Sequence, residues 1–187
     1  APGKYTLRMT LGDVISETEI TILPNPKVVS SPEDFIEQQK MLVSIENTVK
    51  EMHESVNQMR SAKTQLSHYT KLLKDSKNAD SLIEKGKELT KRINSWEENL
   101  IQAKQKTFQD VINFNNKLNA QLIQLKSYVD QANPKVTNGA KERFDDLMKD
   151  WQVYKNERDT IINTEMKAYN DLFKALAIPA LILEEKQ

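Results

Sequence analysis

The sequence lacks cysteine, net charge and long apolar runs, and each absence excludes a class of protein. Without cysteine, its 187 residues contain no disulfide, no thiolate nucleophile and no cysteine-based zinc or iron–sulfur site. Its 27 basic and 27 acidic side chains cancel, which removes the electrostatic attraction typical of a nucleic-acid-binding domain. No apolar run approaches the roughly 20 residues that span a bilayer. We therefore expect no nucleic-acid partner and no membrane span.

The first 28 residues have the pattern of a β-hairpin. Apolar and polar residues alternate before Gly12-Asp13, a dipeptide suited to a tight turn, and again before Pro24. In the first expected strand Tyr5, Leu7, Met9 and Leu11 share one face, and in the second Ile20 and Ile22 share one face. Because a lone hairpin is only marginally stable in water, it must pack against the helices, pair with another chain, or form the end of a β-domain whose earlier strands are missing. We favour the last, so residues 1–28 are interpreted as the end of a truncated β-sandwich.

From residue 31 onward the apolar period changes from two to about three and a half, which predicts long amphipathic helices. Ser31 and Pro32 make a good start for the first of them. Its seam consists of Phe35, Leu42, Ile45, Val49, Met52, Val56, Met59, Leu66 and Leu73, interrupted at Lys63 and Thr70. Further helices are expected from about residue 80, from about residue 118 and after Gly139. The stretch 105–116 is less regular and predicts a turn or a kinked continuation.

The last long helix has its own seam, which ends before Pro179. The seam positions are Ala140, Phe144, Leu147, Trp151, Tyr154, Arg158, Ile161, Glu165, Ala168 and Leu172. The apolar tail 175–183 is expected to pack back on the bundle or the hairpin. The predicted fold is mainly α: an antiparallel bundle of three to four long helices over residues 29–187, preceded by the hairpin.

Motifs for catalysis are scarce. His53 and His68 are fifteen residues apart on one helix, or roughly 22 Å, too far to share a metal ion or a proton. The carboxylates alternate with lysines, as expected of solvated helix faces, and the glycines match no phosphate-binding loop. We therefore predict no catalytic residue, no cofactor and no metal site in these residues.

Six residues remain as candidates for contacts with a ligand or partner. Trp96, Phe114, Trp151 and Tyr154 could form an aromatic cleft for a glycan or peptide, although tryptophans on a helix seam more often belong to the core. Arg158 and Glu165 could form a buried polar pair that serves a ligand, although such residues more often reach solvent at the edge of a bundle.

Three segments together resemble a known family. Residues 2–9 read PGKYTLRM, residues 22–28 read ILPNPKV and residues 109–119 read QDVINFNNKLN. In this order they resemble the C-terminal end of large secreted bacterial proteins with sortilin-like BNR/Asp-box β-propellers, often labelled glycosyl hydrolases. The resemblance implies a small β-sandwich segment followed by a helical C-terminal region. It also implies that any sugar chemistry belongs to the propellers, because these residues contain no Asp-box.

The resemblance leads to the main functional hypothesis. The chain is expected to be a non-catalytic structural or interaction module of a protein that is secreted, periplasmic or on the cell surface, with the upstream propellers as its partners. A homodimer that forms through the hairpin is a further possibility. The alternatives are a binding module that uses the aromatic cleft, an enzyme with a site around Arg158, Glu165 and Tyr154, and a free-standing coiled-coil adaptor.

Overall fold

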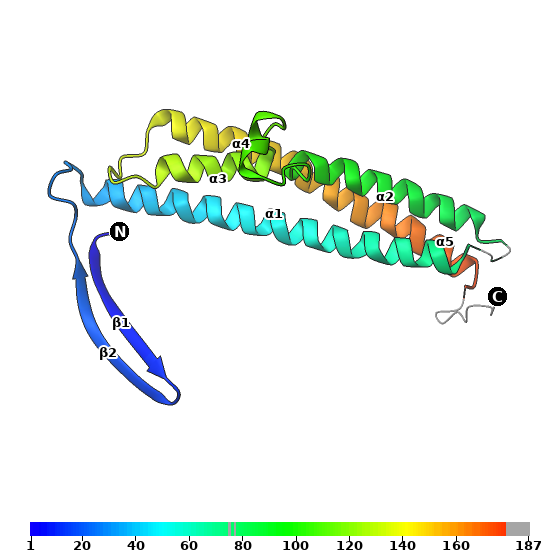
Figure 1. Ribbon diagram of the computed structural model, residues 1–187, viewed down its shortest axis with the longest axis horizontal. Coiled ribbons are helices and arrows are strands. Elements are labelled where there is room, and N and C mark those ends of the chain that lie inside the picture. Colours follow the sequence, from blue (N-terminus) through cyan, green and yellow to red (C-terminus); the bar gives the residue numbers. More distant parts are fainter. Residues whose placement is uncertain (75, 77, 179–187) are drawn as a thin grey trace. The chain divides into compact units, whose positions relative to one another are not determined.

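The computed structural model describes residues 1–74, 76 and 78–178. In this part of the chain four helices follow an antiparallel two-stranded hairpin, as predicted (Figure 1). The elements are β1 (Gly3–Leu11), β2 (Val14–Ile22), α1 (Pro32–Leu72), α2 (Asp80–Leu100), the 3₁₀ helix η1 (Phe108–Ile112), α3 (Leu118–Val129) and α4 (Asn138–Thr160), which continues through the π-helix η2 (Ile161–Met166) into α5 (Lys167–Ala175). The contacts divide the chain into two compact units. The first consists of Ala1–Thr48 and Leu122–Asp145, and the second of Val49–Gln121 and Asp146–Gln187. The boundary expected near residue 28 lies between β2 and α1 and stays a prediction.

The hairpin has the predicted turn and register. Leu11 pairs with Val14, so the loop consists of Gly12 and Asp13 alone, and Gly12 has a φ of 57°, which favours glycine. The nine paired positions run from Gly3 opposite Ile22 to this turn. Every residue of β2, and every residue of β1 after Gly3, is exposed. The hairpin therefore lacks a buried face.

The helices of the first unit begin and end with specific polar contacts. At the start of α1, the Asp34 amide donates to Ser31 Oγ at 3.2 Å, and the Ser31 amide donates to Asp34 Oδ2 at 2.8 Å. This reciprocal capping confirms the predicted start. At the end of α3, Gln38 Nε2 donates to the carbonyl oxygens of Val129 and Gln131, at 2.8 and 2.9 Å. The apolar core of this unit consists of Ile45, Leu122, Leu125, Val129 and Val136.

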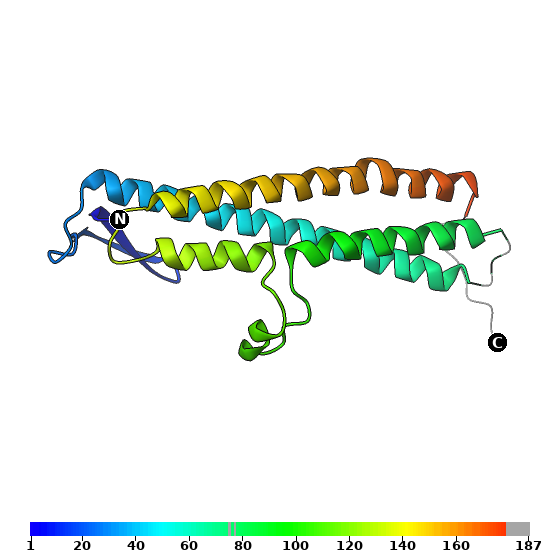
Figure 2. The ribbon, with the colours of Figure 1, turned by 90° about the horizontal axis from the view of Figure 1, so that it is seen from above.

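The second unit has the larger apolar core. Figures 1 and 2 show the later part of α1 running beside α2 and α5. The core consists of Met52, Val56, Met59, Leu66, Leu73, Ala79, Leu82, Leu89, Ile93, Trp96, Leu100, Leu118, Leu147, Trp151, Ile161 and Tyr169. The buried positions of α1 confirm the later part of the seam predicted for the first helix, because apolar side chains spaced by three, four and seven residues share one face of a helix.

The seam predicted for the last helix is wrong after Ile161. The next buried residue is Tyr169 rather than Ala168, which is only partly buried. The π-helix explains why the buried position moves from 168 to 169. A π-helical turn contains one more residue than an α-helical turn, so the residue that faces the core comes eight positions after Ile161 instead of seven. The Tyr169 ring packs against Gly86 of α2, where no side chain stands in its way. Its Cε2 atom lies 3.3 Å from the position that a Cβ at residue 86 would occupy.

Of the two forms predicted for the irregular stretch between α2 and α3, the structure has the turn and not the kinked helix. It contains η1, and its own side chains hold it together. Gln105 Nε2 donates to the Phe114 carbonyl oxygen at 2.8 Å, and Asp110 Oδ2 accepts the Thr107 amide, also at 2.8 Å. Ile112 is 84% exposed at this connection. The tail predicted over 175–183 lies mostly outside the described residues.

Candidate functional site

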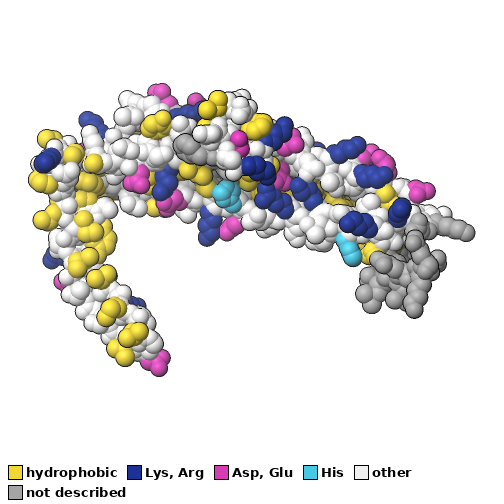
Figure 3. All heavy atoms as spheres, in the orientation of Figure 1, with side chains coloured by type: hydrophobic (Ala, Val, Ile, Leu, Met, Phe, Trp, Pro, Cys, Tyr) yellow, Lys and Arg dark blue, Asp and Glu magenta, His cyan; other side chains and the backbone are white. Residues whose placement is uncertain are grey.

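The hairpin has one apolar and one charged face, and both are exposed. Because directly opposite residues share a face, the register places Ser16 and Thr18 on the apolar face and no charged residue there. The apolar members of that face are Tyr5, Leu7, Met9, Leu11, Val14, Ile20 and Ile22, with exposed fractions from 39% at Ile20 to 77% at Leu11. The other face carries an ion pair between Arg8 and Glu17. Figure 3 shows hydrophobic side chains gathered along the hairpin.

The two tryptophans considered for an aromatic cleft are core residues. Trp96 is fully buried and Trp151 is 1% exposed. The Trp96 indole N–H donates to the Tyr154 carbonyl oxygen at 2.8 Å, and the Trp151 indole N–H donates to Glu51 Oε2 at 3.2 Å. Both polar atoms are therefore used inside the unit, and neither ring offers an exposed face on which a sugar could stack.

The other two aromatic candidates are partly buried and lie on different elements. Tyr154 belongs to α4, where burial and then the negative charges of Asp150 and Glu157 raise the pKa of its phenol. Phe114 lies in the connection between α2 and α3. The raised pKa favours the neutral form of the Tyr154 phenol.

Arg158 and Glu165 do not form the polar pair considered from the sequence. Arg158 Nη1 donates to Ser55 Oγ of α1 at 2.9 Å, and its Nη2 lies 2.8 Å from Asp159 Oδ1. Glu165 Oε1 instead lies 3.5 Å from Arg92 Nε of α2. Each of the two residues thus connects the last helix to a different neighbouring helix.

An ion-pair cluster between α1 and α2, centred on the buried carboxylate of Glu97, was missed from the sequence. Glu97, 8% exposed, accepts from Arg60 Nε at 2.8 Å and from Lys63 Nζ at 2.9 Å. Burial raises the pKa of Glu97, but the hydrogen bonds from Lys63 and Arg60 outweigh this effect, and the pKa lies below its ordinary value. The interruption of the apolar seam at Lys63 was the signal that a charged partner lies opposite.

A second cluster joins α1 to α4 around Glu51. Its Oε1 lies 2.7 Å from Lys155 Nζ, and its Oε2 accepts the Trp151 indole N–H. Burial raises the pKa of Glu51, but the hydrogen bonds from Lys155 and Trp151 outweigh burial and bring the pKa below its ordinary value. Glu51 is therefore ionised at neutral pH and has a structural role, orienting a core tryptophan.

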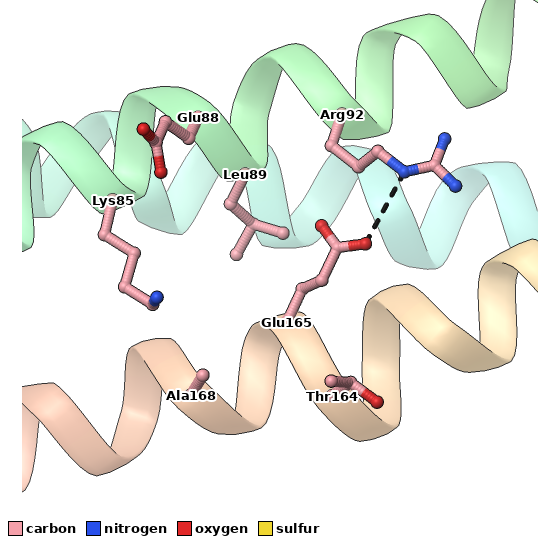
Figure 4. Close-up of a pocket in the computed structure, with 7 residues that line it drawn as sticks. All are labelled: Lys85, Glu88, Leu89, Arg92, Thr164, Glu165 and Ala168. Carbon is pink, nitrogen blue, oxygen red and sulfur yellow. Dashed lines mark ion pairs between the residues drawn. The ribbon is translucent and has the colours of Figure 1, made fainter.

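A pocket of about 410 Å³ lies between α2 and the last helix (Figure 4). Lys85, Glu88, Leu89 and Arg92 line it from α2. The π-helix contributes Thr164 and Glu165, and α5 contributes Ala168. The pocket thus combines two cations, two carboxylates, a hydroxyl and an apolar floor.

The described residues contain no group of three or more His, Cys, Asp or Glu side chains placed to hold a metal ion. His68 is exposed, and His53 lies with its Nε2 3.5 Å from Asn119 Nδ2. Within the same described residues, no helix is long and apolar enough to cross a membrane.

Comparison with known proteins identifies no relative: no family model, no curated protein and no solved structure matches this chain.

Proposed function

We propose that this chain is a non-catalytic structural and interaction module, the C-terminal region of a larger exported β-propeller protein, whose hairpin binds a neighbouring β-domain. The observation that carries the proposal is the apolar face of the hairpin, which has seven apolar side chains, no charge and 39–77% exposure. Exposed apolar patches of this kind mark interaction sites.

The chemistry of the hairpin favours another β-sheet as the partner. Two strands do not form a stable sheet in water, whereas three or more strands with a covered apolar face do. Both strands also have an unpaired edge over nine residues without an internal proline, which suits the addition of further strands. A β-sandwich supplies both missing interactions, because one of its sheets extends the hairpin at an edge and the facing sheet covers the apolar face.

A second copy of the hairpin is the alternative occupant, since the same apolar face and unpaired edges would serve a homodimer. A dimer that forms through the hairpin in the full-length protein would therefore contradict a β-domain of the same chain as the occupant.

The resemblance to secreted sortilin-like propeller proteins supports the same assignment. In that family a small β-sandwich segment precedes the helical C-terminal region, which is the order expected if β1 and β2 end a β-domain. Any glycoside hydrolase activity of the parent then belongs to its propellers. The helices serve as a scaffold or assembly surface.

Reading the coding sequence upstream of Ala1 tests the proposed parent. Several hundred residues with Asp-box repeats and a signal peptide would support the proposal. A start codon immediately before Ala1 would contradict it.

A pair of substitutions in the full-length protein tests the role of the hairpin. Leu7→Lys places a charge on the apolar face and is expected to lower the melting temperature of the neighbouring β-domain by several degrees, because the charge is desolvated at the contact. Thr6→Lys adds the same charge to the opposite face and serves as the matched control. Equal melting temperatures for the two variants would exclude the apolar face as the contact.

A further inference from the structure

The pocket between α2 and the last helix depends on the π-helix. In a regular α-helix, residues eight apart lie about 80° from each other around the axis. The extra residue of η2 reduces this angle to about 20°. Glu157 and Glu165 are eight apart and both reach Arg92: Glu157 Oε2 lies 3.1 Å from Nη2, and Glu165 Oε1 lies 3.5 Å from Nε. The π-helix thus places Glu165 at the pocket.

Only some of the charged side chains of the pocket form ion pairs. Arg92 donates to Glu157, while its contact with Glu165 is a longer ion pair without a hydrogen bond. Lys85 and Glu88 form no ion pair with any residue of the described chain. Figure 4 shows Lys85 and Glu165 reaching into the space between the two helices. Lys85 and Glu88 are therefore free to bind a ligand, and Glu165 is held only by its longer contact with Arg92.

The arrangement of these charges selects the class of ligand. A simple anion attracted by Lys85 meets the negative charges of Glu88 and Glu165, and a simple cation meets Lys85. A molecule with a carboxylate, an ammonium group and an aliphatic part satisfies both signs and covers Leu89, the apolar floor. The volume of about 410 Å³ is within the range of small-molecule pockets.

We propose that this pocket binds a zwitterion of the amino-acid or dipeptide class, with its carboxylate on Lys85, its ammonium group on Glu165 and its aliphatic side chain on Leu89. This binding site is independent of the hairpin and of the interaction with a β-domain. The carboxylate of Glu88 lies at the same pocket and provides a second acceptor for the ammonium group.

The test is a titration of the full 187-residue chain with glycyl-leucine, followed by the backbone amide resonances. We expect saturable shifts confined to residues 85–92 and 161–168, with a dissociation constant in the millimolar range of small, weakly enclosed ligands. Lys85→Gln and Glu165→Gln are each expected to weaken binding about tenfold. Lys91→Gln, an exposed lysine of the same helix outside the pocket, is the matched control and is expected to leave binding unchanged.

Two further probes separate the zwitterion from simpler ligands. N-acetylglycyl-leucinamide has the same aliphatic group without either charge, and acetate has the anion alone. No saturable shift with glycyl-leucine, or equal binding of either probe, would overturn the proposal. Circular dichroism of each variant verifies that the helices are intact, so a loss of binding is assigned to the missing side chain.

Discussion

The hairpin and the helices of the second unit use their apolar residues in opposite ways. In the helical unit the apolar seams are covered, and buried polar atoms such as the Trp96 and Trp151 indole N–H groups have partners. In the hairpin the apolar residues form an equally clean face, yet that face is exposed. The helical unit thus buries its apolar seams within this chain, whereas the hairpin exposes the apolar face that a β-domain covers under the proposed function.

The sharpest test of this comparison is a matched pair of large-to-small substitutions. Trp96→Ala removes a fully buried ring and is expected to destabilise the helical unit by about 3–5 kcal/mol. Leu7→Ala removes an exposed side chain and is expected to change the same free energy of unfolding by less than about 0.5 kcal/mol. Urea unfolding followed by the helical circular dichroism signal measures both. A comparable loss in Leu7→Ala would mean that the hairpin already has its partner within this chain.

A smaller effect is expected at the ion-pair cluster of Glu97. Glu97→Gln removes the charge that accepts from Arg60 and Lys63, and should lower stability at neutral pH by about 1–3 kcal/mol. The pKa of Glu97 is lowered in the folded state, so its contribution is fully present above the ordinary value of 4.5 and is lost as the pH falls through the lowered pKa. The difference between wild type and variant should therefore shrink below about pH 4.5.

The control for this pH dependence is Glu98→Gln, since Glu98 is the exposed neighbour on the same helix. The difference in the free energy of unfolding between wild type and Glu98→Gln should stay small at every pH of the same range. A gap between wild type and Glu97→Gln that persists at low pH would show that the side chain acts through packing rather than through its charge.

The smallest effect is expected at Gly86. Alanine gains about 1 kcal/mol of helix propensity over glycine, but its Cβ would stand 3.3 Å from the Tyr169 ring. We expect Gly86→Ala to be within about 0.5 kcal/mol of wild type, and the propensity gain to appear when Tyr169→Leu removes the ring. Gly139→Ala, where no atom lies within 4 Å, provides the unobstructed reference. Equal gains in both Tyr169 backgrounds would contradict the contact.

The fold was largely predictable because periodicity and capping act locally. The alternation in residues 5–22, the Gly12-Asp13 turn and the capping at Ser31 each determine their own element. The π-helix was not predictable in the same way. The spacing from Ile161 to Ala168 fits a regular seam, and only the size of Tyr169, together with the room that Gly86 leaves for its ring on another helix, decides in favour of position 169.

The functional residues were harder to predict, because their partners are distant in sequence. Arg158 and Glu165 share a seam, but each finds its partner on another helix, 103 residues away at Ser55 in the case of Arg158. A single sequence shows which charges interrupt a seam, as Lys63 does. It does not show which charge lies opposite, because that depends on the tertiary packing of the helices.

The exposed face of the hairpin also has a consequence for colloidal behaviour. With 27 positive and 27 negative side chains and a pI of about 7.0, copies of this chain have no net electrostatic repulsion at neutral pH. Short-range attraction between apolar faces then acts unopposed whenever two copies collide. Solubility should pass through a minimum near pH 7 and rise on either side of it, as the molecules acquire a common sign of charge.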